Sequence, residues 1–258
     1  MELLAKTSPS ETHLLLKQNK AEFKDLLKFT FIDLVRKNVL EPIKVTKGAR
    51  GRTRTNTYVH IGSQFKHYQP SKHEIIYLSP FQKSPSVQIH IKSFVKMSIE
   101  NSGGLFAYRK AILSSSNLSS LIDNRLIPRI FNWVKLTPLG VSTKKEIANY
   151  LRKLEDEIPE LLKNNQKEAL KRLLAIQGNF YLLNNLDFEL LNQIDSDLVI
   201  ELNRQYQNSY NSFSDIDYWY ALENYSNSFD NGYDSAGYDS GSGCSSCSGC
   251  GGCGGCGN

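Results

Sequence analysis

The apolar positions of the first 80 residues change from a helical to an alternating period. Residues 23–35 place apolar side chains three and four positions apart, which predicts an amphipathic helix. Upstream, Ser-Pro-Ser-Glu at 8–11 is a helix-start sequence with a capping box. Over residues 43–61 extended runs flank a turn rich in Lys, Gly and Arg, and residues 74–79 are apolar and β-branched enough for a third strand that ends at Pro80.

Helix, short β-ribbon and basic turn together are typical of a winged helix, which we expect over residues 1–80. A weaker copy follows over residues 81–140. It has a helix from Ser84 to the Gly103-Gly104 break, a second helix over 118–130, and an extended segment from Trp133 into a turn at Gly140. The sequence therefore predicts one or two winged-helix-like units, the second as an internal repeat.

Residues 141–205 have a helical pattern throughout. Thr143 and Glu146 are spaced as a capping box ahead of a long apolar stripe at 147–162, and shorter apolar repeats continue to Ile194. The expected fold is therefore mainly α with small β-ribbons, C-terminal helices and a tail.

Residues 206–258 differ in composition from the rest of the chain. They are rich in Ser, Asn, Asp and Tyr up to Gly243, and then consist almost only of Gly, Ser and Cys. Such a stretch buries too little aliphatic surface to offset its ordering entropy, which predicts a disordered tail. The cluster of Ile216, Trp219, Tyr220 and Leu222 suggests one short docking helix within it.

The composition excludes several classes of protein. Hydrophobic residues make up 40% and charged residues 22% of the 258, and no apolar run approaches the length of a membrane span. The N-terminus has no secretory-signal pattern, so a cytoplasmic location is expected. Motifs of catalysis are scarce, because the two Ser-x-x-Lys matches at 93–96 and 142–145 have no partner motif. The protein is not expected to be an enzyme.

Charge is unevenly distributed along the chain. All 31 Lys and Arg precede residue 205 together with 20 of the 26 acids, so residues 1–204 carry +11 and the remainder −6. A body of this charge attracts polyanions or an anionic membrane surface, and it attracts its own acidic tail as well.

The turn of the first β-ribbon carries the densest basic cluster, and we take it as a candidate polyanion-binding site. Its residues are Lys44, Lys47, Arg50, Arg52 and Arg54. In a winged helix, such a wing lies along the phosphate backbone, and Lys66, Lys72 and His73 are placed to widen the patch. The alternative is a solvated hairpin tip whose charges keep an edge strand from aggregating.

The cysteines form the second candidate site, for metal binding or modification. They are Cys244, Cys247, Cys250, Cys253 and Cys256, an unbroken three-residue period. Repeated thiolates suit a soft metal such as Zn²⁺ or Cu(I), but structural zinc sites use two Cys-x-x-Cys knuckles with a folded spacer, and none is present. No cofactor is therefore expected, and cross-linking, lipid attachment or enzymatic modification are the alternatives.

The Tyr-Trp-Tyr run at 218–220 and the Gly/Cys-rich terminus together resemble the cytosolic part of a bacterial family of uncharacterised membrane proteins with Gly/Cys-rich C-terminal tails. This chain lacks that family's transmembrane helices. The last fifteen residues also resemble the core of thiazole/oxazole-modified peptides of the microcin type. That resemblance implies modification of the cysteines at 244–256 and of the serines between them, with the body acting as an outsized leader.

The function expected from these features is that of a non-catalytic binding or adaptor protein. Its basic winged-helix body would hold a protein partner or a polyanion, and its thiol-rich tail would tether, bind metal or accept modification. A nucleic-acid-binding regulator that uses the same wing is the first alternative, and a precursor with a modified tail is the second. The oligomeric state is left open.

Overall fold

The computed structural model describes residues 2–49, 52–123, 133–184, 186, 188–192, 194 and 218–237. The α-helices are α1 (Glu2–Lys6), α2 (Pro9–Lys17), α3 (Phe23–Arg36), α4 (Ile75–Lys83), α5 (Ile91–Asn101), α6 (Gly104–Leu113), α8 (Pro138–Asn164), α9 (Gln166–Ala175), α10 (Phe188–Asn192) and α12 (Tyr218–Ser235). The strands are β1 (Leu40–Ala49), β2 (Arg52–Ile61) and β3 (Ile89–His90), and three 3₁₀ turns are η1 (Gln18–Lys20), η2 (Ser116–Leu118) and η3 (Gln177–Leu182). The expectation of a mainly α fold with a small β-ribbon is confirmed.

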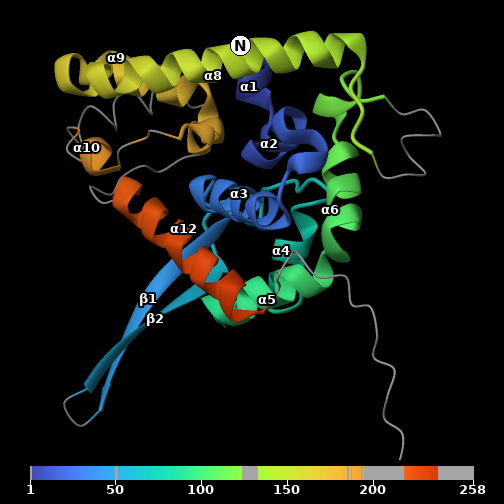
Figure 1. Ribbon diagram of the computed structural model, residues 1–258. Coiled ribbons are helices and arrows are strands. Elements are labelled where there is room, and N and C mark those ends of the chain that lie inside the picture. Colours follow the sequence, from blue (N-terminus) through green and yellow to red (C-terminus); the bar gives the residue numbers. More distant parts are fainter. Residues whose placement is uncertain are drawn as a thin grey trace, which may run out of the picture.

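Helix α3 lies at the centre of the molecule. Figure 1 shows α8 and α9 as a layer at one end, α1 and α2 beneath them, and α4 and α5 at the opposite end, with α6 along one side. Helix α12 crosses α3 obliquely and also contacts α5 and α10. The chain thus wraps around α3, and residues far apart in sequence meet on it.

The core forms around the apolar face of α3. Leu26, Leu27 and Phe31 on this helix are completely buried. The Phe31 ring contacts Phe94 of α5 (5.8 Å between centroids) and stacks on Phe229 of α12 (5.4 Å). The three-and-four spacing read from the sequence therefore marks the face that packs against its neighbours.

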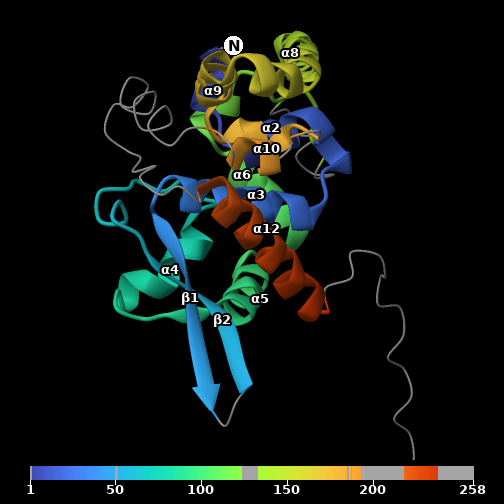
Figure 2. The same ribbon diagram turned by 90° about the vertical axis from the view of Figure 1, so that its left-hand side faces the viewer.

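The sheet has the order β1-β2-β3 and is antiparallel throughout. The β1–β2 ladder runs from Leu40 opposite Ile61 to Ala49 opposite Arg52, while β3 pairs with only two residues of β2. Figure 2 shows that β1 and β2 extend beyond the helices as an arm. The hairpin expected around the basic turn is confirmed.

The strand expected at residues 74–79 is wrong, because this segment begins α4. Tyr77 and Phe81 of α4 are fully buried, and the Tyr77 hydroxyl donates to the Leu27 carbonyl (2.9 Å). Pro80 lies inside the helix and cannot donate to the Ile76 carbonyl, but the Ser79 hydroxyl donates to it instead (3.5 Å). A short apolar run suits a strand or a buried helix equally well, and here its burial against α3 decided for the helix.

The long C-terminal helix begins earlier than expected. Its N-cap is Thr137, whose hydroxyl accepts from the Gly140 amide (3.0 Å), and Pro138 occupies the first helical position. The predicted Thr143–Glu146 capping box therefore lies inside α8, and residues 138–140, expected to be extended, are helical. Asn165 follows the last helical residue.

The stretch predicted as a second unit, residues 81–140, contains α5, α6 and η2. Its described residues hold β3 and one isolated bridge, Ile122 with Leu136, and no second β-ribbon. The helix expected at 118–130 is not formed over 119–123, and residues 124–132 lie outside the described part. Helix α5 begins at Ile91 rather than at Ser84, and Gly103 adopts a left-handed conformation (φ 70°) between α5 and α6.

The disordered tail expected from residue 206 is wrong over residues 218–235, which form α12. Leu222, Phe229 and Tyr233 of this helix are buried. The docking helix suggested by the aromatic cluster is thus longer than expected, and its anchors lie mostly downstream of that cluster.

Candidate polyanion interface

The register of the arm places the basic residues unevenly between its two faces. Lys47 is directly opposite Arg54, and Ala49 is opposite Arg52, so three basic residues hold positions on one face near the tip. Lys44, opposite Thr57, is on the other face. Directly opposed like charges destabilise a hairpin. The Lys47–Arg54 pairing therefore does not stabilise the hairpin through its charges.

Acidic residues are absent from the sequence of the arm between residues 42 and 59, which holds five Lys and Arg. The nearest acid, Glu41, lies at the base opposite His60, with 3.7 Å between its carboxylate and the imidazole. Lys44 is exposed, and Arg50 lies outside the described residues. The positive charge of the tip thus has no internal counterion along its own strands.

The base of the arm is pinned by a close backbone contact. Gly62 follows β2, and its amide donates to the Val39 carbonyl (2.9 Å). A Cβ at Gly62 would lie 2.1 Å from the Asn38 carbonyl oxygen, so only glycine fits. Asn38 itself has a positive φ (53°), which turns the chain sharply from α3 into β1. These contacts hold the arm at one angle to α3.

A buried charged network holds the same junction from the other side. The Lys37 ammonium lies 2.7 Å from Asp33 and donates to the Tyr68 hydroxyl (2.9 Å), which donates in turn to Glu74 (2.7 Å). Arg36 donates to Asp33 as well (2.9 Å). Burial alone would raise the pKa of the Asp33 carboxyl, but the cations of Lys37 and Arg36 hold it below its usual range.

The same network fixes the charge of Lys37. Burial would lower its pKa, but the carboxylates of Asp33 and Glu74 raise it above its usual value, so the ammonium stays charged. Because Lys37 is just before β1 and Tyr68 is in the segment after β2, the network ties both ends of the arm to α3.

His73 is not part of the basic surface, contrary to expectation. Its ring is buried and its Nε2 lies 3.4 Å from the Ser10 hydroxyl. Burial lowers the pKa of His73, which favours the neutral ring. Lys66 and Lys72 are exposed, as a contribution to the patch would require.

The acidic helix α12 pairs with lysines of α3. Asp230 lies 3.2 Å from the Lys28 ammonium, and Asp234 lies 2.8 Å from that of Lys24. At the arm, the Tyr225 hydroxyl donates to the Pro42 carbonyl (2.9 Å), at the base of β1. The attraction between body and tail that the charges suggested is therefore present, and it neutralises α3.

The cysteine array at 244–256 lies outside the described residues. Within the described part, no group of three or more His, Cys, Asp or Glu side chains is placed to hold a metal ion. None of the helices in that part combines the length and apolar character of a membrane span.

Comparison with protein-family models, curated proteins and solved structures found no match to this chain. What the protein does must therefore be inferred from its own residues.

Two features of this region were missed from the sequence. The sequence analysis did not single out Asp33 or Glu74, although both are buried and paired. The docking of α12 was signalled by Phe229 and Tyr233 at helical spacing from Leu222, but the high Ser and Asn content around them obscured the pattern.

Proposed function

We propose that the protein is a non-catalytic binding protein whose arm holds double-stranded nucleic acid. The observation that carries this proposal is the Lys47–Arg54 cross-strand pair in an arm with no acid between residues 42 and 59. Phosphates supply the counterions that the arm lacks, and Lys and Arg bound to them release condensed cations from the nucleic acid.

The shape of the arm supports the same partner. A two-stranded ribbon fits the major groove of a duplex, which is about 12 Å wide. The junction that fixes the arm to α3, with Gly62 and the Lys37 network, presents the tip in a defined direction. The order α3, β1, β2 with a short third strand supports a winged-helix-like unit in which the arm is the wing.

Titration with a duplex of mixed sequence at two salt concentrations tests the proposal. We expect the affinity of the natural protein to fall steeply with salt, by about 0.9 log units per log[salt] for each phosphate neutralised. The variant Lys44→Ala/Lys47→Ala/Arg52→Ala/Arg54→Ala should bind weakly at both salt concentrations. Its plot of log affinity against log[salt] should be less steep, with a slope smaller in magnitude by about three to four.

A matched control removes the same charge elsewhere, at the exposed residues Arg152, Lys163, Lys167 and Lys171 of α8 and α9. This control variant should bind the duplex more tightly than the arm variant does and should retain most of the salt dependence of the natural protein. Equal losses in the two variants, or no binding of the natural protein at low salt, would contradict the proposal. The second result would leave the arm as a contact for a protein partner.

A further inference from the structure

A second part of the chain is as basic as the arm. Residues 101–145 hold seven Lys and Arg and a single acid, Asp123. Together with the arm, this stretch accounts for the whole +11 charge of residues 1–204. The proposed nucleic-acid site uses only the first of these two regions.

The same stretch carries most of the exposed large hydrophobic side chains of the described residues. Phe106 on α6 is 59% exposed, Trp133 60%, and Leu139 and Val141 at the start of α8 are 56% and 58%. Single exposed apolar residues need no explanation, but several within one basic region indicate a surface that meets an apolar partner.

Hydrogen bonds join the three parts of this region into one surface. The Arg109 guanidinium of α6 donates to the Asn19 carbonyl (3.0 Å), and the Val134 amide donates to the Asn19 side chain (2.8 Å). Gln18 donates to the Val134 carbonyl (3.4 Å) and accepts from Lys144 of α8 (3.0 Å). Trp133 is therefore held between α6 and the first turns of α8.

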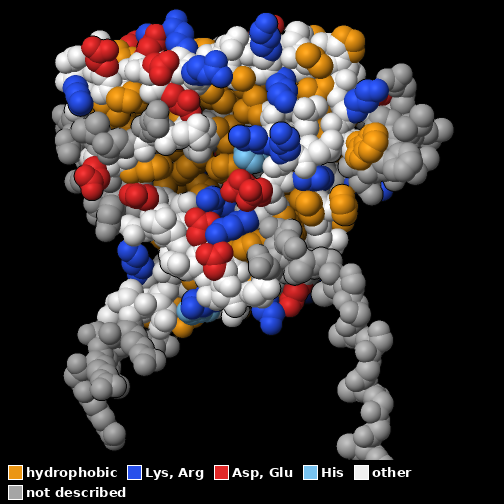
Figure 3. All heavy atoms as spheres, in the orientation of Figure 1, with side chains coloured by type: hydrophobic (Ala, Val, Ile, Leu, Met, Phe, Trp, Pro, Cys, Tyr) orange, Lys and Arg blue, Asp and Glu red, His pale blue; other side chains and the backbone are white. Residues whose placement is uncertain are grey.

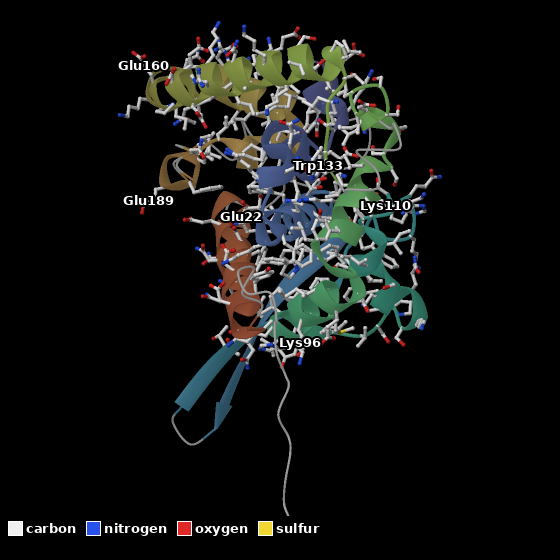
Figure 4. All side chains as sticks on the ribbon, turned by 45° about the vertical axis from the view of Figure 1, so that its right-hand side comes forward. Glu22, Lys96, Lys110, Trp133, Glu160 and Glu189 are labelled. Carbon is white, nitrogen blue, oxygen red and sulfur yellow. The ribbon has the colours of Figure 1, made fainter. Side chains whose placement is uncertain are left out.

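Exposed lysines alternate with the apolar residues. Lys110 follows Phe106 by one helical turn, Lys135 is two residues after Trp133, and Lys145 follows Val141 by one turn. Figure 4 labels Trp133 and Lys110 close to α6, and Figure 3 shows hydrophobic and basic side chains interspersed along the edge formed by α6 and the start of α8. We call these residues the α6–α8 face: Phe106, Lys110, Trp133, Lys135, Leu139, Val141 and Lys145.

We propose that the α6–α8 face docks on an anionic lipid bilayer. Trp side chains favour the level of the lipid headgroups, where one part of the ring system is apolar and the other can be hydrated. Phe106, Leu139 and Val141 supply apolar surface for the outer acyl region, and the lysines supply attraction to acidic headgroups. A phosphate backbone would pair with the lysines but gives exposed Leu and Val nothing to bury.

This inference does not rest on the function proposed for the arm, since it uses none of the arm residues. It assigns the second basic region to a different partner. The attachment is peripheral and reversible, because a few inserted side chains and charges hold a protein at a membrane surface without spanning it.

Trp fluorescence provides a direct measurement. The chain has two Trp, so Trp219→Phe leaves Trp133 as the single reporter. Vesicles of phosphatidylcholine with about one third phosphatidylserine should shift the Trp133 emission to shorter wavelength and sediment the protein, with the effect reduced by salt. Vesicles of phosphatidylcholine alone should do so weakly.

Two variants separate charge from insertion. Lys110→Gln/Lys135→Gln/Lys145→Gln should weaken binding about a hundredfold, since each lysine contributes about fivefold. Leu139→Ser/Val141→Ser, at exposed positions in the first turn of α8, should weaken binding at every salt concentration. The control Lys163→Gln/Lys167→Gln/Lys171→Gln removes the same charge from exposed positions near the other end of the α8–α9 layer and should retain most of the binding.

An unchanged Trp133 spectrum and no sedimentation with anionic vesicles at low salt would overturn the proposal. Loss of duplex binding in the Lys110/Lys135/Lys145 variant, with vesicle binding absent, would assign the face to nucleic acid instead. The arm variant should bind vesicles nearly as the natural protein does, so failure at the arm and failure at the α6–α8 face give different results.

Discussion

The lysines of α3 and the basic residues of the arm have the same chemistry but different surroundings. Lys24 and Lys28 are paired with Asp234 and Asp230 of α12, whereas the described contact of α12 with the arm is at the base, where the Tyr225 hydroxyl donates to the Pro42 carbonyl. The acids of α12 therefore pair with lysines of α3. The distribution of net charge along the sequence did not distinguish the lysines of α3 from the basic residues of the arm.

The two regions also differ in what stabilises them. Ion pairs that are partly exposed contribute about 1 kcal/mol or less each, while a fully buried aromatic side chain contributes several times more. Phe229, rather than the Asp–Lys pairs, should therefore hold α12 in place. We expect the Asp–Lys pairs to determine where α12 lies along α3.

The largest expected effect is on the docking of α12. Phe229→Ala removes the ring that stacks on Phe31 and should lower the free energy of unfolding by about 3–5 kcal/mol. Urea denaturation measures this. Phe106→Ala, at an exposed position on α6, should change it by less than about 0.5 kcal/mol. Equal effects would mean that α12 is not anchored by its aromatic face.

The second effect is a pH dependence centred on His13, a buried residue of α2 whose ring contacts Phe29 of α3. Burial lowers the pKa of His13 to about 4, and the charge of Lys17 lowers it further, while the carboxylate of Glu22 opposes the shift. In the unfolded chain, the His13 imidazole takes up a proton near pH 6.5. The contribution of the neutral ring to the free energy of unfolding is therefore fully present above that pH, and about 3 kcal/mol of it is lost as the pH drops to about 4.

The replacement His13→Gln should flatten this part of the stability profile, measured as melting temperature from pH 7.5 to 5. His67→Gln, at an exposed site, should leave the profile unchanged. Duplex affinity should change little over the same range while the protein stays folded, because the residues of the arm proposed to hold phosphates are Lys and Arg rather than His. A profile that His13→Gln does not alter would contradict the assignment.

A third effect concerns the base of the arm. Gly62→Ala places a Cβ against the Asn38 carbonyl and should destabilise the protein by about 1–3 kcal/mol. It should also weaken duplex binding, because the arm must move away from α3. Ser63→Ala, at the exposed neighbouring residue, is the control and should change neither the unfolding free energy nor the affinity.

The smallest effect is expected at the α3 lysines. Lys24→Gln/Lys28→Gln should lower the free energy of unfolding by about 1 kcal/mol or less, and the loss should shrink at about 0.5 M salt. Duplex binding should be retained, unlike in the arm variant. A loss of binding as large as that of the arm variant would show that α12 does not shield these lysines.

Features of the fold set by neighbouring residues were predicted well. The capping box at Ser8 and Glu11 forms as expected, with the Ser8 amide donating to the Glu11 carboxylate (2.8 Å). The β1–β2 hairpin and the buried stripe of α8 also follow their sequence patterns. Capping and periodicity depend on residues within one or two turns, so the sequence alone carries the signal.

The candidate site was predicted only in part. The sequence placed Lys44, Lys47, Arg52 and Arg54 around one hairpin, and the register confirms that neighbourhood. It also placed His73 on the basic surface, which is wrong because its ring packs beside Ser10, 63 residues away. A histidine's burial depends on which distant helix covers it, and no local pattern reports that.

What the sequence determined by itself was the helical period of α3 and α8, the hairpin, and the concentration of charge, because each is a property of consecutive residues. Tertiary structure alone decided that residues 75–83 are helical, that α12 docks on α3, and that its acids meet Lys24 and Lys28. These outcomes depend on the apolar surface that Phe31 and its neighbours offer to segments up to two hundred residues away. Burial against that surface outweighed the local preferences of both segments.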